Sequence, residues 1–322
     1  MLRSGLLCGA AIVLVSAATA GSADAKSQLT TFDPTGSIST YAVSINKSGT
    51  VAGYYAVSSD ATHGFVRTSD GTITAFDPKG STSTGVASIN DNGDIAGWYR
   101  DASGTYFNFV RASDGTITKF KASQGYEPYA LGLNAKGKVA GWYYTYDYGT
   151  AGFVGMPQGK MKQLAVQGVA INTRGDVAGI DGSQGFVRTP SGKITTFSGP
   201  GSPNSTTPTS INDSGVVAGY DRTGCGTAHG FSRTANGDAT AVDPPNSEYT
   251  LVQAVNDKGA LTGVYYYGGY HGFVLSRGGS YKAFDAPGAT YGTYPQSINT
   301  NGEVAGEYFD GNDVQHGFVG MP

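Results

Sequence analysis

The sequence has few of the residues that covalent cross-links, metal sites and nucleic-acid surfaces need. It contains two cysteines, four histidines and 14% charged residues among 322. Cys8 lies in the N-terminal apolar segment, so Cys225 is the one thiol beyond it; we expect no internal disulfide and interpret Cys225 as incidental. The net charge of -3 gives no basic surface for nucleic acid or anionic lipid, which excludes those partners.

Long apolar runs are missing as well, except at the N-terminus. One stretch, from about Leu6 to Ala17, follows Arg3 and precedes two small-residue sites, Ala18-Thr19-Ala20 and Ala23-Asp24-Ala25. This pattern is typical of a secretory signal peptide and is too short to span a bilayer. We expect residues 1–25 to be a signal peptide, cleaved at either site. Residues 26–322 are then one exported domain, secreted or periplasmic in a bacterium, without membrane insertion.

Glycine and asparagine, by contrast, are abundant and form a repeat. There are 50 glycines, and the pattern apolar-Asn-x-x-Gly followed by a small apolar run occurs seven times, with 38 to 44 residues between successive asparagines. The repeated asparagines are Asn46, Asn90, Asn134, Asn172, Asn212, Asn256 and Asn299. This period is that of a four-stranded propeller blade.

The copy SINDNGDIAGWYR, from Ser88 to Arg100, is rich in acids and resembles a calcium-binding loop. A calcium loop needs oxygen ligands at fixed positions. The two residues after Asn in the seven copies read KS, DN, AK, TR, DS, DK and TN, so lysine or arginine often stands where a ligand would be needed. Asn and Gly are instead typical of tight hairpin turns. We interpret the repeat as a turn and expect no metal or cofactor; only Asp91 and Asp94 remain as a hypothesis for weak cation binding.

Each copy continues with a strand of the type GFVR and one of the type TITAF, which makes four strands per unit. The seventh unit ends at GFVGMP without its last strand, and LTTFD, from Leu29 to Asp33, is a last strand without a unit. Pairing the two would close a ring and remove its open edges. The sequence therefore predicts an all-β, seven-bladed β-propeller whose N-terminal strand completes the last blade. A parallel β-solenoid is the alternative, disfavoured by the Gly-turn hairpins and the complementary termini.

Histidine and aspartate vary together among the predicted blades. Each histidine precedes the GF strand of a blade in which an aspartate follows the last strand; the pairs are His63 with Asp77, His229 with Asp243, His271 with Asp285, and His316 with Asp33. The other three blades lack both residues. Such paired variation predicts a structural hydrogen bond within each blade. The alternatives are a shared zinc, for which separate blades lie too far apart, and a catalytic dyad, which would not need to recur four times.

The recurring INxxGxVAGYY…HGFV pattern, from about Thr30 to Val319, resembles the HAF-repeat family of bacterial extracellular proteins, with HGF in place of HAF. The resemblance implies export and a β-repeat fold. It implies no catalytic residues, because the family has none to transfer.

Aromatic residues concentrate in the predicted second and third blades, together with Arg100, Asp101, Glu127 and Asp147. Tyr106, Tyr126, Tyr146 and Tyr148 have no counterpart in the repeat, and we expect them to form a binding surface on one face. Trp98 and Trp142 end a strand that is aromatic in most blades. They are therefore candidates either for ligand contact or for packing between blades.

Three functions are compatible with these residues. We favour an extracellular module that binds a glycan or a cell-surface protein. A structural or adhesive surface protein is the second hypothesis, and it would show no saturable binding of small ligands. A polysaccharide-active hydrolase or lyase is the third, since single acids such as Glu127, Asp147 and Glu307 could form an acid/base pair. No catalytic residue and no oligomeric state is predicted.

Overall fold

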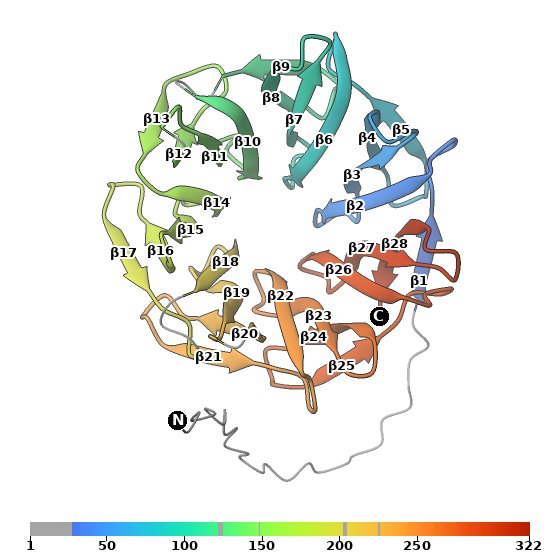
Figure 1. Cartoon of the computed structure of the whole chain (residues 1–322), viewed down its shortest axis with the longest axis vertical. Helices are drawn as coiled ribbons and strands as arrows, with labels where there is room; N and C mark the ends of the chain where they lie inside the picture. Colours follow the sequence, from blue (N-terminus) through green and yellow to red (C-terminus); the bar gives the residue numbers. More distant parts are fainter. Residues whose placement is uncertain (1–27, 122–124, 148, 202–204, 225) are drawn as a thin grey trace, which may run out of the picture.

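The computed structural model describes residues 28–121, 125–147, 149–201, 205–224 and 226–322. The predicted signal peptide, Tyr148 and Cys225 lie outside these ranges. Seven four-stranded antiparallel sheets surround a central axis (Figure 1). The predicted all-β propeller with seven blades of four strands is thus confirmed. No helix long and apolar enough to cross a membrane occurs in the described part of the chain.

The blades are numbered here in chain order, and in each the strand nearest the axis comes first (Figure 1). Blade 1 contains β2 (Ser39–Ile45), β3 (Val51–Ala56), β4 (Thr62–Arg67) and β5 (Ile73–Phe76). Blade 2 contains β6 (Ser81–Ile89), β7 (Ile95–Asp101), β8 (Tyr106–Arg111) and β9 (Ile117–Phe120). Blade 3 contains β10 (Tyr126–Leu133), β11 (Val139–Tyr144), β12 (Thr150–Gly155) and β13 (Met161–Leu164). Blade 4 contains β14 (Gln167–Ile171), β15 (Val177–Asp181), β16 (Gln184–Arg188) and β17 (Ile194–Phe197). Blade 5 contains β18 (Thr206–Ile211), β19 (Val217–Arg222), β20 (Ala228–Arg233) and β21 (Ala239–Val242). Blade 6 contains β22 (Tyr249–Val255), β23 (Leu261–Tyr266), β24 (Tyr270–Leu275) and β25 (Tyr281–Phe284). Blade 7 contains β26 (Gly292–Ile298), β27 (Val304–Phe309), β28 (Gln315–Met321) and β1 (Gln28–Phe32).

Blade 7 joins the two ends of the described chain. The N-terminal strand β1 pairs antiparallel with the C-terminal strand β28, with Thr30 opposite Val319 and Phe32 opposite Gly317. This pairing supplies the fourth strand that the seventh repeat lacks. The ring is therefore closed by hydrogen bonds, as the sequence predicted, and β1 covers the outer edge of β28 that would otherwise be unpaired.

The repeated Asn-x-x-Gly segment forms the turn between the first two strands of each blade. In blade 2 the Asn90 side-chain oxygen accepts the backbone N–H groups of Asn92 and Asp94, at 3.0 and 2.9 Å. Gly93 has a φ of 84°, a conformation that glycine adopts without strain. The turn interpretation of the repeat is confirmed.

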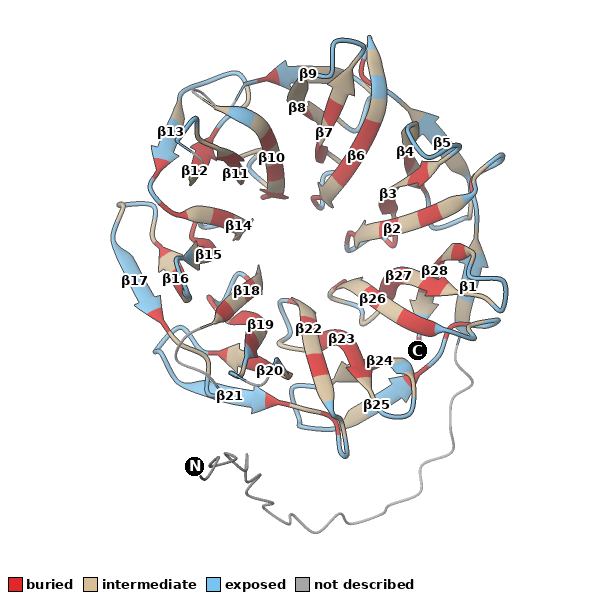
Figure 2. Ribbon diagram, viewed as in Figure 1, coloured by how far each residue is buried: buried red, intermediate tan, exposed pale blue. Residues whose placement is uncertain are grey.

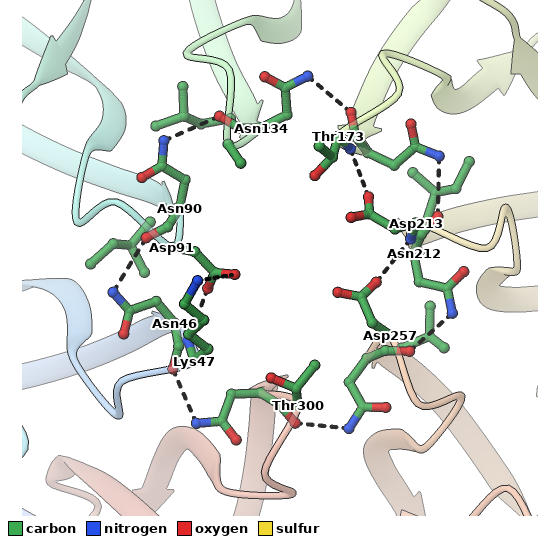
Figure 3. Close-up of a pocket in the computed structure, with 18 of the residues that line it drawn as sticks. Asn46, Lys47, Asn90, Asp91, Asn134, Thr173, Asn212, Asp213, Asp257 and Thr300 are labelled. Atoms are coloured by element: carbon green, nitrogen blue, oxygen red, sulfur yellow. Dashed lines mark hydrogen bonds and ion pairs between the residues drawn. The ribbon is translucent and has the colours of Figure 1, made fainter.

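The same asparagines also connect the blades, which the sequence analysis does not predict. The side-chain amide of each donates to the backbone carbonyl of the repeated asparagine in the next blade, from Asn46 to Asn90 and onward until Asn299 donates to Asn46. The seven distances lie between 2.8 and 3.3 Å, and Figure 3 shows the closed ring around the axis. Each amide is buried, so both its oxygen and its nitrogen find partners in the scaffold.

The core lies between neighbouring blades, where the strand interiors are buried (Figure 2). The third strand of each blade supplies one fully buried phenylalanine: Phe65, Phe109, Phe153, Phe186, Phe231, Phe273 and Phe318. In five blades this ring meets the edge of a phenylalanine from the last strand of the preceding blade, as Phe109 meets Phe76 at 6.0 Å. The glycine of VAG is required beside it, because a Cβ on Gly53 would lie 2.0 Å from the Tyr41 carbonyl oxygen.

Candidate functional site

The four predicted His–Asp pairs are in hydrogen-bond contact. The distances from Nδ1 to the nearest carboxylate oxygen are 2.6 Å for His63–Asp77, 3.1 Å for His229–Asp243, 2.9 Å for His271–Asp285 and 2.6 Å for His316–Asp33. A carboxylate only accepts, so Nδ1 is the protonated nitrogen of each ring. The last pair joins the N-terminal strand to the C-terminal one and reinforces the ring closure.

The residues around these His–Asp pairs connect strands and neighbouring blades, and we call each pair with its contacts a structural joint. In three of the four pairs a tyrosine of the second strand packs on the imidazole, as Tyr308 does on His316 with ring centroids 5.1 Å apart. The second carboxylate oxygen reaches the first strand of the next blade: Thr40 donates to Asp33 and Thr84 donates to Asp77, each at 2.5 Å. Each aspartate in these two joints therefore ties a histidine of its own blade to the neighbouring blade.

Two of the three blades without the pair have other contacts at the same positions. In blade 2, Phe107 stacks on Tyr99 at 5.2 Å, and the Lys121 ammonium lies 5.4 Å from the Phe107 ring centre. In blade 4, Gln184 donates to Ser198 at 3.3 Å. The contact at this position is thus present in these blades, although different side chains form it. No group of three or more His, Cys, Asp or Glu side chains that could hold a metal is found in the described ranges.

Asp91 and Asp94, the residues of the weak-cation hypothesis, are engaged by donors. One oxygen of Asp91 accepts the Lys47 backbone N–H at 3.0 Å, and the Lys47 ammonium lies 3.7 Å from the other oxygen. Asp94 accepts from the Asn90 amide at 3.1 Å and from the Ser113 N–H at 3.2 Å. Asp91 lines the channel mouth of about 190 Å³ shown in Figure 3, where Asp213 and Asp257 accept N–H groups of the preceding blade in the same way. These three carboxylates add further hydrogen bonds between neighbouring blades beside the asparagine ring.

The predicted aromatic residues of blades 2 and 3 form one continuous cluster. Trp98 contacts Tyr106 and Tyr129, with ring centroids 5.6 and 5.9 Å apart. From Tyr129 the contacts continue through Trp142, Tyr144 and Tyr126 to Tyr146, at 5.0 to 5.9 Å per step. The cluster runs from the half-buried tryptophans to Tyr146, which is 78% exposed.

A cleft of about 610 Å³ lies at the exposed end of this cluster, between blades 2 and 3. Its described lining includes three of the four predicted tyrosines, Tyr106, Tyr126 and Tyr146, together with Lys121 and Glu127. Trp98 and Trp142 do not line the cleft but support it from behind through their ring contacts. Tyr148 lies outside the described residues. The sequence analysis did not identify Lys121 as part of this surface, because the lysine replaces a structural aspartate and gives no separate pattern.

The backbone of the cleft is held in an unusual conformation. Glu127 has a φ of 47°, one of three non-glycine residues with positive φ in the described chain. The Tyr129 hydroxyl donates to a Glu127 carboxylate oxygen at 3.3 Å. Burial first, and the Glu127 charge second, raise the pKa of Tyr129, so the hydroxyl stays protonated and available as a donor. Positive φ at a non-glycine residue is strained and is enriched at binding sites.

A smaller cleft of about 420 Å³ occupies the equivalent place between blades 6 and 7. It is lined by Tyr270 and Tyr291, which hold the repeat positions of Tyr106 and Tyr126, and by the His271–Asp285 pair. The prediction that Tyr106 and Tyr126 have no counterparts is therefore wrong. Two shared spacings could have shown it. Tyr106 and Tyr270 each begin the third strand, three residues before its buried phenylalanine, and Tyr126 and Tyr291 each lie seven residues before the end of the first strand.

Comparison with known proteins yields solved structures only; no protein family and no curated protein matches the chain. A streptogramin B lyase structure aligns with a TM-score of 0.59 at 13% identity over 91% of this chain and 97% of that one. A catalytically inactive virginiamycin B lyase from Staphylococcus aureus with quinupristin gives 0.60 at 15% identity, covering 92% and 99%. A chain of the mitotic checkpoint complex gives 0.58 at 14% identity, covering 96% and 98%. These identities show a shared propeller fold, and the fold serves unrelated functions.

Proposed function

We propose that this protein is an extracellular carbohydrate-binding β-propeller and that its binding site is the cleft between blades 2 and 3. The observation that carries the proposal is the tyrosine-lined cleft itself, with Glu127 and Lys121 beside Tyr126 and Tyr146. Its volume of about 610 Å³ lies within the usual range for small-ligand sites. The predicted signal peptide and the resemblance to HAF repeats, both of which stay predictions, agree with a role outside the cytoplasm.

The chemistry of the cleft suits a sugar ring. Exposed tyrosine faces offer apolar surface to the C–H face of a pyranose, while hydroxyl, carboxylate and ammonium groups meet its equatorial hydroxyls. Tyr126 stacks on Tyr144 at 5.6 Å, which holds its ring in place before a ligand arrives. A ring that is already ordered loses little conformational entropy on binding.

The carboxylates support binding in preference to hydrolysis. Glycosidases place two carboxyl groups about 5 to 10 Å apart across one pocket. Among the described residues that line the cleft, Glu127 is the one carboxylate. Glu307 lines a different cavity, on the axis. The hydrogen bond from Thr145 lowers the pKa of the exposed Asp147, which favours the ionised carboxylate, whereas a general acid must be protonated.

The test is a glycan and polysaccharide screen with the mature protein, followed by titration of every positive. The test variant is Tyr126→Ala/Tyr146→Ala, and the matched control is Tyr270→Ala/Tyr291→Ala, which removes the equivalent rings between blades 6 and 7. We expect the first variant to lose about tenfold or more in affinity, since each buried ring contact contributes about 1 kcal/mol. The control should bind like the wild type, and both should keep the wild-type melting temperature.

Two results would contradict the proposal. If the wild type binds no glycan, the carbohydrate assignment fails and the structural or adhesive hypothesis takes its place. If a glycan binds but only the control variant weakens it, the ligand is correct and the cleft is wrong.

A further inference from the structure

The axial channel has a wall built by one repeated irregularity. The innermost strand of every blade has a register shift just before its last two residue pairs with the second strand, for example between Ala42 and Ser44 in β2. Six of the seven residues that these shifts skip line a cavity of about 400 Å³ on the axis: Val43, Ala87, Leu131, Val169, Thr209 and Gln296. Most of this wall is apolar, as expected for positions that only fill space around the axis.

Glu307 breaks the apolar pattern of this cavity. It occupies the residue after VAG in β27, and the same position in the other blades holds Tyr54, Trp98, Trp142, Ile180, Tyr220 and Val264. Glu307 is the one carboxyl group in the described lining, and no lysine or arginine lines the cavity with it. A carboxyl group in such a place lacks a counter-charge, which is costly for its ionised form.

Glu307 lines the cavity, and its carboxyl group has one hydrogen-bond donor among the described residues. Gln296 on β26 donates to Oε1 at 2.7 Å. Tyr54 on β3 and Tyr294 on β26 are the titratable neighbours, and the pKa of each is raised by burial first, so both stay neutral at physiological pH. Tyr54 in turn stacks on Tyr41 at 4.5 Å, and both rings line the cavity with Trp98.

We propose that this axial cavity is a second ligand site, specific for a small organic cation such as a primary or quaternary ammonium group, with Glu307 as the counter-charge and the rings of Tyr41 and Tyr54 as aromatic walls. Aromatic faces attract an ammonium group, and a carboxylate beside them supplies the charge that the cavity lacks. The cavity has the volume for an occupant of this size. This site does not rest on the proposed glycan function, because it lies on the axis and not between blades 2 and 3.

A neutral occupant is the competing possibility, since a protonated carboxyl group could donate to a hydroxyl or carbonyl oxygen. The two differ in their response to pH. Choline keeps its charge at every pH, so its affinity reports the protonation of Glu307. Burial raises the pKa of Glu307 to about 8. Below that pH, each increase of one pH unit makes the carboxylate about ten times more abundant, so a cation should bind about tenfold more tightly. A neutral ligand that needs the protonated acid would show the opposite trend.

The experiment is calorimetric titration of the whole mature protein with choline and with its neutral isostere, in which carbon replaces the charged nitrogen. We expect saturable binding of choline, tighter at higher pH, and none of the isostere. Glu307→Gln keeps the size and polarity of the side chain and should weaken choline binding about tenfold or more. Glu248→Gln, which changes an exposed carboxyl group directly before β22, is the matched control and should bind choline like the wild type.

Changes at Tyr54 test the aromatic wall separately. Tyr54→Phe keeps the ring and should retain binding, whereas Tyr54→Leu should weaken it several-fold. Absence of choline binding by the wild type, or equal binding by wild type and Glu307→Gln, would overturn the proposal. Binding of the isostere but not of choline would assign the cavity to a neutral ligand instead. None of these outcomes depends on the glycan screen, so each proposal can fail alone.

Discussion

Replacing Glu307 with glutamine should change how the stability of the protein depends on pH. The substitution removes the one carboxyl group in the described lining of the axial cavity and keeps a side chain of the same length beside Gln296. Burial raises the pKa of Glu307 from its ordinary 4.5 to about 8, against the opposing effect of the Gln296 hydrogen bond. The folded protein therefore holds a proton on Glu307 over a pH range in which the unfolded chain has released it.

The sign and size of the effect follow from this difference. Where the folded state binds more protons than the unfolded chain, raising the pH destabilises the fold. The stability that proton binding by Glu307 contributes is therefore complete below about pH 4.5 and is lost as the pH approaches 8. Each unit of pKa difference corresponds to about 1.4 kcal/mol, which gives a loss of about 3 to 5 kcal/mol across the window. Glutamine does not titrate, so the variant lacks this loss and should be the more stable protein at alkaline pH.

The assay is urea unfolding at about pH 5, 7 and 9, followed by the fluorescence of Trp98 and Trp142. The free energy of unfolding of Glu307→Gln should come to exceed that of the wild type progressively between pH 5 and 9. Glu248→Gln, at an exposed position, should follow the wild type at every pH. A constant difference between Glu307→Gln and the wild type across this range would refute the account of a buried, protonated carboxyl group.

Three further substitutions test the scaffold by urea unfolding. Asn134→Ala removes a buried side-chain donor to the next blade at 2.9 Å and a side-chain acceptor of two backbone N–H groups at 3.0 Å. The free energy of unfolding should fall by about 2 to 4 kcal/mol, and a fall of less than about 1 kcal/mol would show that the asparagine ring adds little stability. Gly53→Ala should destabilise by about 3 kcal/mol or more because its Cβ would meet a carbonyl oxygen at 2.0 Å, whereas Gly224→Ala, with open space around it, should be neutral; equal effects would contradict this account. His63→Phe and Asp77→Lys should each lower the free energy of unfolding by about 1 to 2 kcal/mol. The double variant recreates the Phe–Lys contact of blade 2 and should recover at least half of the summed loss, whereas strictly additive losses would show that the two kinds of contact are not interchangeable.

The fold could be predicted from sequence because a repeat supplies several observations of each position. Seven copies of one turn exposed the blade, and a last strand missing at one end with a spare at the other exposed the closure that β1 and β28 make. The joint variation of histidine and aspartate pointed to contacts that the structure shows at 2.6 to 3.1 Å. In each case the inference needed only the comparison of equivalent residues.

What could not be predicted depends on how blades are placed around the axis. The turn role of Asn90 follows from local chemistry, but its donation to Asn134 requires two turns to meet at the ring centre, which no spacing along the chain reveals. The cleft likewise needs a loop geometry, including the positive φ of Glu127, that gives no sequence pattern. Lys121 was visible only as the absence of an aspartate.

Glu307 shows how the repeat can separate scaffold from function. Six blades hold apolar or aromatic residues at its position, so the ring can be built without an acid there. Blade 7 carries the acid although burial of a carboxyl group lowers stability wherever it is ionised. Asn299 in the same blade is the opposite case, because it repeats in all seven blades and every polar atom of its side chain has a partner in the ring or the turn. A residue that repeats and is fully satisfied belongs to the scaffold, and a residue that departs from the repeat at a cost in stability is where a ligand should be sought.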